Sequence, residues 1–492
     1  MTFQKKAKIA ASLTLTLLVM ACTPSPENVM KVDRLPNIYP DYANVTIPSN
    51  IAPLNMLLRD DVEAVELKAI CGNTELMVRD RGNAIRFDID EWKSFINECT
   101  GKHATVTITS LKDGQWTQYA PFQWKVSADT IDTYLTYRLI EPDYEIYQNL
   151  SLRERCIENF EERAIADYGL VGNRCMNCHT YGHQDPTLSM LYIRGEGGGA
   201  ILNRNGKLTK LNIKTDDMVS GSVYFCFSPN GRYITFSTNV IIPAFHAAPR
   251  KRLEVFDNAS DVYVADLDSH AIIKNKLLSD SSSFETFPTF SPDGKYIYYC
   301  VSPKVKLPMQ LKDMRYSLCR MAFDEQTGAF GETVDTIFSG PLHKLSVCHP
   351  RISPDGRLIV FSVAEYGTFP IWHQEADLQM MNLQTGEMCD MSIANSDKSD
   401  TYHSWASNSR WLVFASKRDD GLFGKPYFCH IDKNGKVEKP FVLPQQDPEF
   451  YDNTLKSFNA PELGSGKLPF DAWDVKKATE GATIDFKSVN LK

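Results

Sequence analysis

The strongest constraint on the fold is a sequence pattern that returns four times in the second half of the chain. A Ser-Pro-Asp-Gly-like turn precedes an apolar, strand-forming run each time, and the turns begin at Ser228, Ser291, Ser353 and Ser407. Further strand-like runs with turns of their own, such as "DVYVADLDS" and "LCRMAFDEQTG", lie between them. A repeat of about 60 residues built only of strands and turns is typical of a β-propeller. We therefore expect residues 191–450 to form a propeller of five or six blades.

The whole chain has 492 residues, so the residues outside the repeats are numerous enough to form further domains. Residues 36–140 alternate apolar and polar side chains in short runs such as "VELKAI" and "ATVTITSL", separated by turn residues. This spacing predicts a small β-sandwich. The predicted fold class is mainly β, and we expect residues 451–492 to be an extended tail that wraps the propeller.

A helical segment is expected between the sandwich and the propeller, over residues 141–190. The run "SLRERCIENFEERAIADYGL" places apolar residues near one face of a helix, with charges elsewhere: Leu152, Cys156, Phe160 and Ile165. A helix that leads into a haem-binding motif is the usual arrangement in c-type cytochromes.

That motif is "CMNCH", with Cys175, Cys178 and His179 in the Cys-x-x-Cys-His spacing. Two thiols three positions apart can bind the two vinyl groups of one haem as thioethers, and the adjacent imidazole can bind the iron. The sequence therefore predicts one covalent haem c. Arg194, which begins the stretch "RGEGGG", is a candidate partner for a haem propionate.

Three alternatives to haem attachment remain open for Cys175 and Cys178. A zinc site needs a second pair of ligands, and the sequence has no second Cys-x-x-Cys. A thioredoxin-like pair needs a βαβ context, which this region lacks. The spacing can also arise by chance in a chain with 12 cysteines. Cys71 and Cys99 are candidates for a disulfide that the sequence cannot decide.

The sequence offers two candidates for a sixth iron ligand and one for a second site. Met190 follows the motif closely, and His246 lies in an apparent insertion between two strands of the first clear repeat. A five-coordinate iron is the alternative. His349 and His403 each lie four residues before the start of a repeat, so we expect them at one level of neighbouring blades. They are a candidate metal or ligand site in the funnel of the propeller. The alternative is that both are ordinary histidines that hydrogen-bond with backbone groups.

The first residues predict export. Residues 1–21 combine a basic start with a short apolar run, and "LVMAC" ends in Cys22, as in a lipoprotein signal whose cysteine is lipidated. The alternative is a secretory signal with a coincidental cysteine. Residues 22–35 are expected to be a linker, and the residue after Cys22 favours an outer-membrane location that faces the periplasm. The net charge of −8 and the absence of a long basic run exclude a nucleic-acid partner.

The repeats resemble the TolB-like family of propellers, related to WD-repeat proteins. The whole chain resembles exported bacterial TolB-like lipoproteins that carry one Cys-x-x-Cys-His site, on the segments "CMNCHTY", "IRGEGGG", "EVFDNASDVYVADL", "TYHSWASNSRWLVFASKRDDG" and "DPEFYDN". This resemblance implies haem at Cys175, Cys178 and His179. It implies no particular enzyme activity.

Three functions follow as hypotheses. The first is an electron-transfer or haem-bearing accessory protein with an envelope redox partner. The second is a binding or scaffold lipoprotein in which the haem is structural or sensory and the channel binds a peptide or glycan. The third is an enzyme similar in layout to cytochrome-plus-propeller reductases, which need several histidines in the funnel; His349 and His403 are too few.

Overall fold

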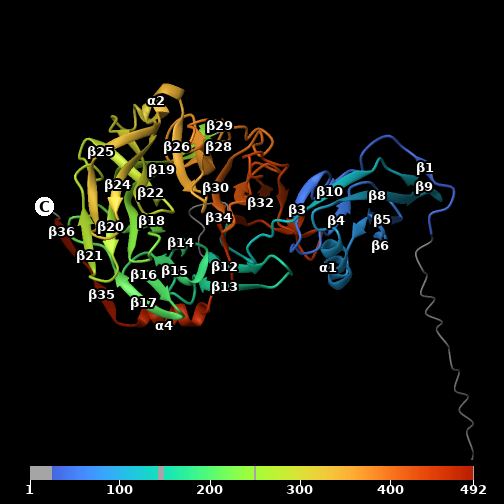
Figure 1. Cartoon of the computed structure of the whole chain (residues 1–492), viewed down its shortest axis with the longest axis horizontal. Helices are drawn as coiled ribbons and strands as arrows, with labels where there is room; N and C mark the ends of the chain where they lie inside the picture. Colours follow the sequence, from blue (N-terminus) through green and yellow to red (C-terminus); the bar gives the residue numbers. More distant parts are fainter. Residues whose placement is uncertain (1–24, 142–148, 249–250, 491–492) are drawn as a thin grey trace, which may run out of the picture.

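The computed structural model describes residues 25–141, 149–248 and 251–490, and it is mainly β. Its two parts are a propeller-like body and an N-terminal domain that lies beside it (Figure 1). The predicted signal and its lipidation site at Cys22 lie outside the described residues. Within those residues, no helix combines the length and the apolar character that a membrane crossing requires.

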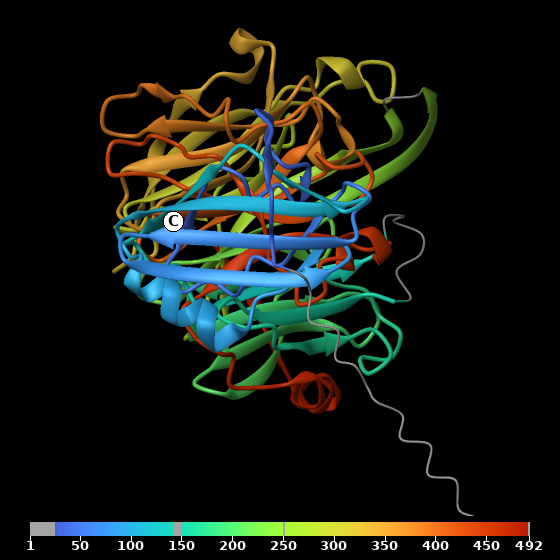
Figure 2. The same ribbon diagram turned by 90° about the vertical axis from the view of Figure 1, so that its right-hand side faces the viewer.

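The N-terminal domain contains two sheets and one helix. The larger sheet has seven strands: β1 (Met30–Lys31), β3 (Val45–Pro48), β5 (Ala64–Cys71), β6 (Thr74–Arg81), β8 (His103–Lys112), β9 (Gln115–Gln118) and β10 (Phe122–Ser127). The smaller sheet has three: β2 (Ile38–Tyr39), β4 (Met56–Leu58) and β7 (Ala84–Ile85). Figure 2 shows the long strands of this domain in front of the propeller-like body. Strand β1 pairs with β9, so part of the expected linker belongs to the domain.

Helix α1 (Ile89–Glu98) is an element that the alternating pattern did not predict. Asp88 caps its first turn by accepting hydrogen bonds from the backbone amides of Asp90 and Glu91. Trp92, Phe95 and Ile96 are its buried residues. Their spacing of three and four positions is the helical period, so residues 89–98 form a helix between β7 and β8.

The body consists of six sheets of four or five strands. The first sheet has β34 (Ser457–Gly464), β11 (Tyr134–Ile140), β12 (Ser151–Cys156) and β13 (Glu162–Asp167), and the second has β14 (Met176–Gly182), β15 (Asp185–Ile193), β16 (Gly199–Arg204), β17 (Lys207–Asn212) and β35 (Thr483–Asp485). The third has β18 (Ser222–Phe227), β19 (Tyr233–Ala248), β20 (Lys251–Asp266), β21 (Ala271–Lys274) and β36 (Lys487–Asn490), and the fourth has β22 (Ser283–Phe290), β23 (Tyr296–Pro303), β24 (Ser317–Asp324) and β25 (Ala329–Phe338). The fifth has β26 (Ser346–Ile352), β27 (Leu358–Ala364), β28 (Asp377–Asn382) and β29 (Met388–Cys389), and the sixth has β30 (Asp400–Trp405), β31 (Trp411–Ser416), β32 (Lys425–His430) and β33 (Phe441–Val442).

The first strands of these sheets contact one another in a closed ring. The order is β14, β18, β22, β26, β30 and β34, and β34 contacts β14 again. Strand β34 comes from the C-terminal part of the chain but pairs with β11, which precedes the other sheets in sequence. The ring is therefore closed by a pairing between residues that are far apart in the chain.

The described part of the expected helical segment is strand instead of helix. Residues 151–156 and 162–167 form β12 and β13, and "MNCH" lies on β14. The prediction of a helical haem segment over 141–190 was therefore wrong for the described residues. Leu152 on β12 and Ile165 on β13 are buried in one hydrophobic cluster, so two paired strands bury apolar residues whose spacing resembled a helical face.

The C-terminal residues are more ordered than the expected extended tail. After β34, helix α4 (Ala472–Glu480) packs against β13, β16 and β17. Strand β35 then pairs in parallel with β17, and β36 pairs in parallel with β21. This segment follows the outer edge of the body, drawn in red in Figure 1, and so wraps it as expected, while β34 is part of the ring.

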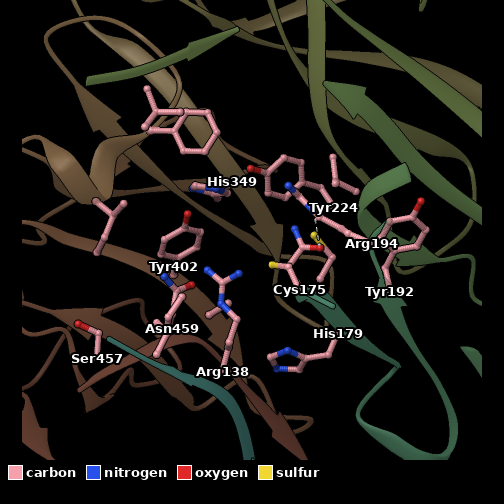
Figure 3. Close-up of a pocket in the computed structure, with 18 of the residues that line it drawn as sticks. Arg138, Cys175, His179, Tyr192, Arg194, Tyr224, His349, Tyr402, Ser457 and Asn459 are labelled. Carbon is pink, nitrogen blue, oxygen red and sulfur yellow. Dashed lines mark hydrogen bonds between the residues drawn. The ribbon is translucent and has the colours of Figure 1, made fainter. Parts of the chain in front are cut away.

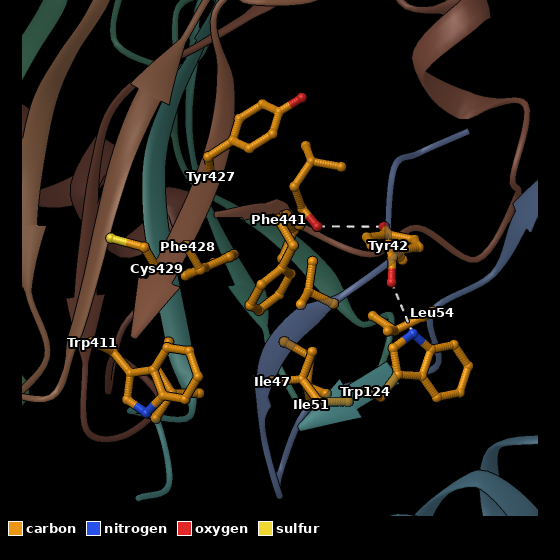
Figure 4. Packing of buried hydrophobic residues seen from close by; sticks show 14 of the residues in the cluster. Tyr42, Ile47, Ile51, Leu54, Trp124, Trp411, Tyr427, Phe428, Cys429 and Phe441 are labelled. Carbon is orange, nitrogen blue, oxygen red and sulfur yellow. Dashed lines mark hydrogen bonds between the residues drawn. The ribbon is translucent and has the colours of Figure 1, made fainter. Parts of the chain in front are cut away.

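The N-terminal domain and the last sheet share one hydrophobic core (Figure 4). Trp124 on β10 donates its indole N–H to the backbone oxygen of Tyr42 at 2.9 Å, and the Tyr42 hydroxyl donates to the backbone oxygen of Val442 at 3.4 Å. Phe441 and Trp411 belong to the same cluster. The continuous core predicts that the domain and the body unfold together.

Candidate functional site

Each of the six innermost strands carries one residue with a left-handed backbone. The six φ values lie between 49° and 55°, and the register of strand pairing shifts at each of these places. A bulge of this kind changes the direction of the side chains on the bulged strand. The residues at these equivalent positions are Cys178, Tyr224, Phe287, His349, Tyr402 and Ala460.

Four of these side chains meet across neighbouring sheets and form the channel cluster, defined as Tyr224, Phe287, His349 and Tyr402. The ring centroids of Tyr224 and Phe287 are 4.5 Å apart, those of Phe287 and His349 are 4.2 Å apart, and those of His349 and Tyr402 are 4.5 Å apart. Such contacts from separate strands show that the bulge residues turn towards the centre of the ring.

The Cys-x-x-Cys-His motif lines a cavity at the same level (Figure 3). The cavity has a volume of about 780 Å³, and Cys175, Cys178 and His179 all contribute to its lining. In a regular strand, residues three positions apart point to opposite faces. The left-handed backbone of Cys178 breaks this alternation and thereby brings both thiols to one cavity. The volume falls within the range of about 300–1,000 Å³ that is typical of small-molecule sites.

His179 has a ring nitrogen with no protein partner. Its Nε2 atom is buried and makes no hydrogen bond in the described structure. Burial and the nearby charge of Arg138 lower its pKa to about 4, against an opposing interaction with the Thr136 backbone. The imidazole is therefore neutral at neutral pH, the form that binds a metal ion. Burial also raises the pKa of the Cys178 thiol, although Arg194 and Arg138 oppose this effect.

Cationic side chains outnumber acidic ones around the cavity. Five cations line it, namely Arg138, Arg174, Arg194, Arg351 and Lys417, whereas its two acidic residues are Glu141 and Glu462. Burial lowers the pKa of Lys417 to about 8. Burial also raises the pKa of Glu462, which accepts hydrogen bonds from the Thr180 hydroxyl and the Tyr181 amide. The cavity therefore favours a ligand with negative charge.

Arg194, which the sequence offered as a candidate propionate partner, lines the same cavity as the motif. Its Nε donates to Oδ1 of Asn177, inside the motif, at 3.0 Å. Arg138 was not singled out from the sequence, because residues up to 140 were expected to belong to the N-terminal sandwich. It lies on β11, inside the ring, so only the pairing of β11 with β34 reveals it as a cavity residue.

Of the two proposed sixth ligands, the structure keeps Met190 away from the cavity and does not describe the side chain of His246. Met190 is 2 % exposed and packs in the core around Ala200 and Leu202, since β15 directs it between the sheets. His246 lies on β19 in the long β19–β20 hairpin, and its side chain is outside the described residues.

His349 lies in the channel cluster, but His403 does not occupy the equivalent position. In the last repeat, Ala406 makes the backbone hydrogen bond to Trp411 that Ser228 makes to Tyr233 in the first. The repeat starts at Ala406 rather than Ser407, so Tyr402 is the residue that matches His349. His403 still borders the cavity, and its Nε2 is paired with the backbone oxygen of Val360 at 2.9 Å. The paired placement of His349 and His403 at one level was therefore wrong by one residue.

The residues of the cavity fit a haem c. Cys175, Cys178 and His179 line one space, and Nε2 of His179 has no hydrogen-bond partner. Arginines line that space, and they are suited to carboxylate groups such as haem propionates. In the described parts of the chain, no three His, Cys, Asp or Glu side chains gather as a metal-binding group. A haem requires no such group, because its porphyrin supplies the equatorial ligands.

No family model and no curated protein matches the sequence. Several solved structures are similar in fold. They include the tricorn protease (12% identity, TM-score 0.35, covering 68% of this chain and 34% of that chain). The periplasmic gluconolactonase PpgL of Pseudomonas aeruginosa gives 14% identity and a TM-score of 0.34, covering 63% of this chain and 96% of that one. A DUF4784 family protein from Bacteroides caccae gives 8% identity and a TM-score of 0.33, covering 83% of this chain and 97% of that one. The chain thus spans about a third of the tricorn protease. At these scores, the similarities carry no argument about activity.

Proposed function

We propose that this protein is an exported, lipid-anchored c-type cytochrome. A six-bladed propeller of the TolB-like kind holds one covalent haem at its channel and exchanges electrons with an envelope redox partner. The observation that supports this most is the shared cavity of Cys175, Cys178 and His179, which a regular strand would not provide. The lipid anchor at Cys22 and an outer-membrane location facing the periplasm are part of the proposal.

Each residue of the motif has a separate role in this proposal. The Cys175 and Cys178 thiols would each add to one vinyl group, with the sulfur bonding to carbon and the thiol proton going to the adjacent carbon. His179 would bind the iron through its unpartnered Nε2. When bound, the haem supplies a centre that accepts and donates single electrons.

The cations of the cavity would hold the propionates and set the electrostatic environment. Arg194 is already oriented by Asn177, so its guanidinium needs little reordering to bind a carboxylate. Arg138 and Arg351 enter from two other sheets of the ring. Positive charge near a redox centre stabilises its electron-rich form and therefore raises its reduction potential.

The test is a pyridine haemochrome spectrum of the lipid-free protein, produced in a host that performs cytochrome c maturation. We expect a c-type spectrum with about one haem per chain. The double variant Cys175→Ala/Cys178→Ala should lose it. Cys226→Ala is the matched control, because Cys226 is also a half-buried thiol on an innermost strand but lies outside the cavity lining.

The outcomes separate the hypotheses. A c-type haem that exchanges electrons rapidly and reversibly supports electron transfer. A haem that is redox-inert or inaccessible supports instead the scaffold lipoprotein with a structural or sensory haem. Absence of haem in the wild-type protein, despite competent maturation, contradicts the cytochrome proposal altogether.

The second candidate function is binding of an anionic peptide or glycan in the same cavity. The observation that favours it is the combination of five cations with Tyr192, Tyr224 and Trp372 in the lining. Under this alternative, Arg138→Met and Arg351→Met should each weaken ligand binding, while Cys175→Ala should leave it unchanged.

A further inference from the structure

His349 is the metal-binding side chain that the ring places opposite the haem motif. The innermost strands follow the order β14, β18, β22, β26, β30 and β34 around the ring. Strand β26 is therefore three positions from β14 in either direction. Because Cys178 and His349 occupy the equivalent bulge position on these two strands, they face each other across the channel.

The imidazole of His349 is buried without a hydrogen-bond partner. Its side chain is 7% exposed, and neither Nδ1 nor Nε2 makes a hydrogen bond in the described structure. Buried polar groups are nearly always paired, so an imidazole with two unpaired nitrogens calls for a ligand. Its ring makes aromatic contacts with Tyr224, Phe287 and Tyr402. Such contacts leave the ring free to turn without breaking a hydrogen bond.

Two other described candidates for an iron ligand, Met190 and His403, are placed less favourably than His349. Met190 packs in the core of the sheets and does not line the cavity. His403 lines the cavity with its Nε2 paired with the backbone oxygen of Val360 and its Nδ1 unpartnered, but it does not occupy the bulge position opposite Cys178. In the view of Figure 3, Cys175 and Arg138 are seen between His349 and His179.

We propose that His349 is the second axial ligand of the haem iron, on the face opposite His179. This inference rests on the proposed function. It assigns to the propeller a direct part in the redox centre: one imidazole comes from the covalent motif on β14, and the other comes from β26 across the channel. A haem held from both sides of the ring would also couple the two halves of the body.

The test compares the spin state of the haem in the wild type and in His349→Phe. Phenylalanine keeps an aromatic ring in the cluster but has no nitrogen. We expect the oxidised wild-type protein to be six-coordinate and low-spin with a bis-imidazole spectrum by electron paramagnetic resonance. His349→Phe should become high-spin, and added imidazole should restore the low-spin signal. Tyr402→Phe is the matched control in the same cluster and should remain low-spin.

A second variant guards against a folding defect. If His349→Phe does not accumulate, His349→Met offers another ligand, and the midpoint potential should rise because methionine ligation favours the reduced iron. A bis-imidazole spectrum in either variant, with the haem still attached, would overturn the role of His349 and leave the cytochrome proposal intact. A wild-type protein without haem would overturn both.

Discussion

The imidazole of His373 and the carboxylate of Glu254 form a buried pair, with Nε2 and Oε1 2.9 Å apart and both side chains at most 1% exposed. The Tyr366 hydroxyl donates to the other oxygen of Glu254 at 2.9 Å, and Nδ1 of His373 lies 3.0 Å from Glu375. Glu254 is on β20, whereas His373 directly follows the short helix η2 (Pro370–Trp372). The pair therefore joins the long hairpin to a segment that lines the cavity.

This pair should make stability depend on pH. Burial lowers the pKa of His373, but the hydrogen bonds to Glu254 and Glu375 outweigh it and raise the pKa above 6.5. A raised folded pKa gives stability that is complete below the unfolded value and is lost as the pH rises through the folded value. Urea unfolding at about pH 6 and about pH 9 should show a lower free energy of unfolding at the higher pH.

His373→Gln should reduce this pH dependence and should destabilise the protein by about 3–5 kcal/mol at the lower pH, as expected when one partner of a buried ion pair is removed. The exposed His103 on β8 offers a control, since His103→Gln should change neither quantity by more than about 0.5 kcal/mol. If the unfolding free energy of His373→Gln depended on pH as in the wild type, the His373–Glu254 pair would not be the cause of that dependence.

Removing the indole of Trp124 should destabilise both parts of the molecule. Its ring lies 5.5 Å from that of Trp92, and it donates a hydrogen bond to Tyr42. Trp124→Ala should cost about 3–5 kcal/mol of unfolding free energy, measured by urea titration. Trp473 on α4 is 58% exposed, so Trp473→Ala should change it by less than about 0.5 kcal/mol. Two separate transitions in the wild type would show that the shared core does not couple the parts.

The closing strand β34 should contribute more to stability than the outer C-terminal strands. Leu463 on β34 is fully buried, whereas Val489 on β36 is 41% exposed. Leu463→Ala should cost about 2–5 kcal/mol and should expose the ring to limited proteolysis. Val489→Ala should stay within about 0.5 kcal/mol. Equal effects of the two substitutions would indicate that closure by β34 is not a critical contact.

Cys71 and Cys99 are positioned to react with each other. Both are buried free thiols, and the neighbouring Cys71 thiol adds to the effect of burial in raising the pKa of Cys99. Oxidised glutathione can accept the two electrons and two protons that are released when their sulfurs bond. We expect thiol titration of the unfolded, oxidised protein to show two fewer thiols, a difference that should be absent in Cys71→Ala. Cys300→Ala should retain the difference, because Cys300 is buried elsewhere.

The repeated turns were sufficient to predict the propeller-like body, because each Ser-x-Asp-Gly turn determines a local hairpin. The closing sheet was not predictable in this way. Its strands β11 and β34 are far apart in sequence, and neither carries the repeated turn. The helical segment expected over residues 141–190 failed because two short strands, β12 and β13, can bury apolar residues at the same spacing, and one sequence does not distinguish these periods over so short a span.

For the candidate site, the motif residues could be found from their spacing, and Arg194 was proposed because it begins the Gly-rich stretch "RGEGGG". His349 was found by counting along the repeats, but the same count missed Tyr402, since the last repeat replaces the starting serine by Ala406. If the repeats had been aligned on the strand residues Tyr233 and Trp411, the count would have pointed to Tyr402. Arg138 had no local signal, because only the non-local pairing of β11 places it in the channel.

The position of β34 has a consequence for the order of assembly. Residues 175–179 precede β34 by most of the ring, so the motif is synthesised long before the strand that completes its cavity. Domains generally begin to fold from the N-terminus as the chain emerges. A maturation enzyme that reaches Cys175 and Cys178 before β34 docks would therefore encounter an open sheet edge beside β14. Insertion of β34 into the ring would then enclose the group already attached to these cysteines.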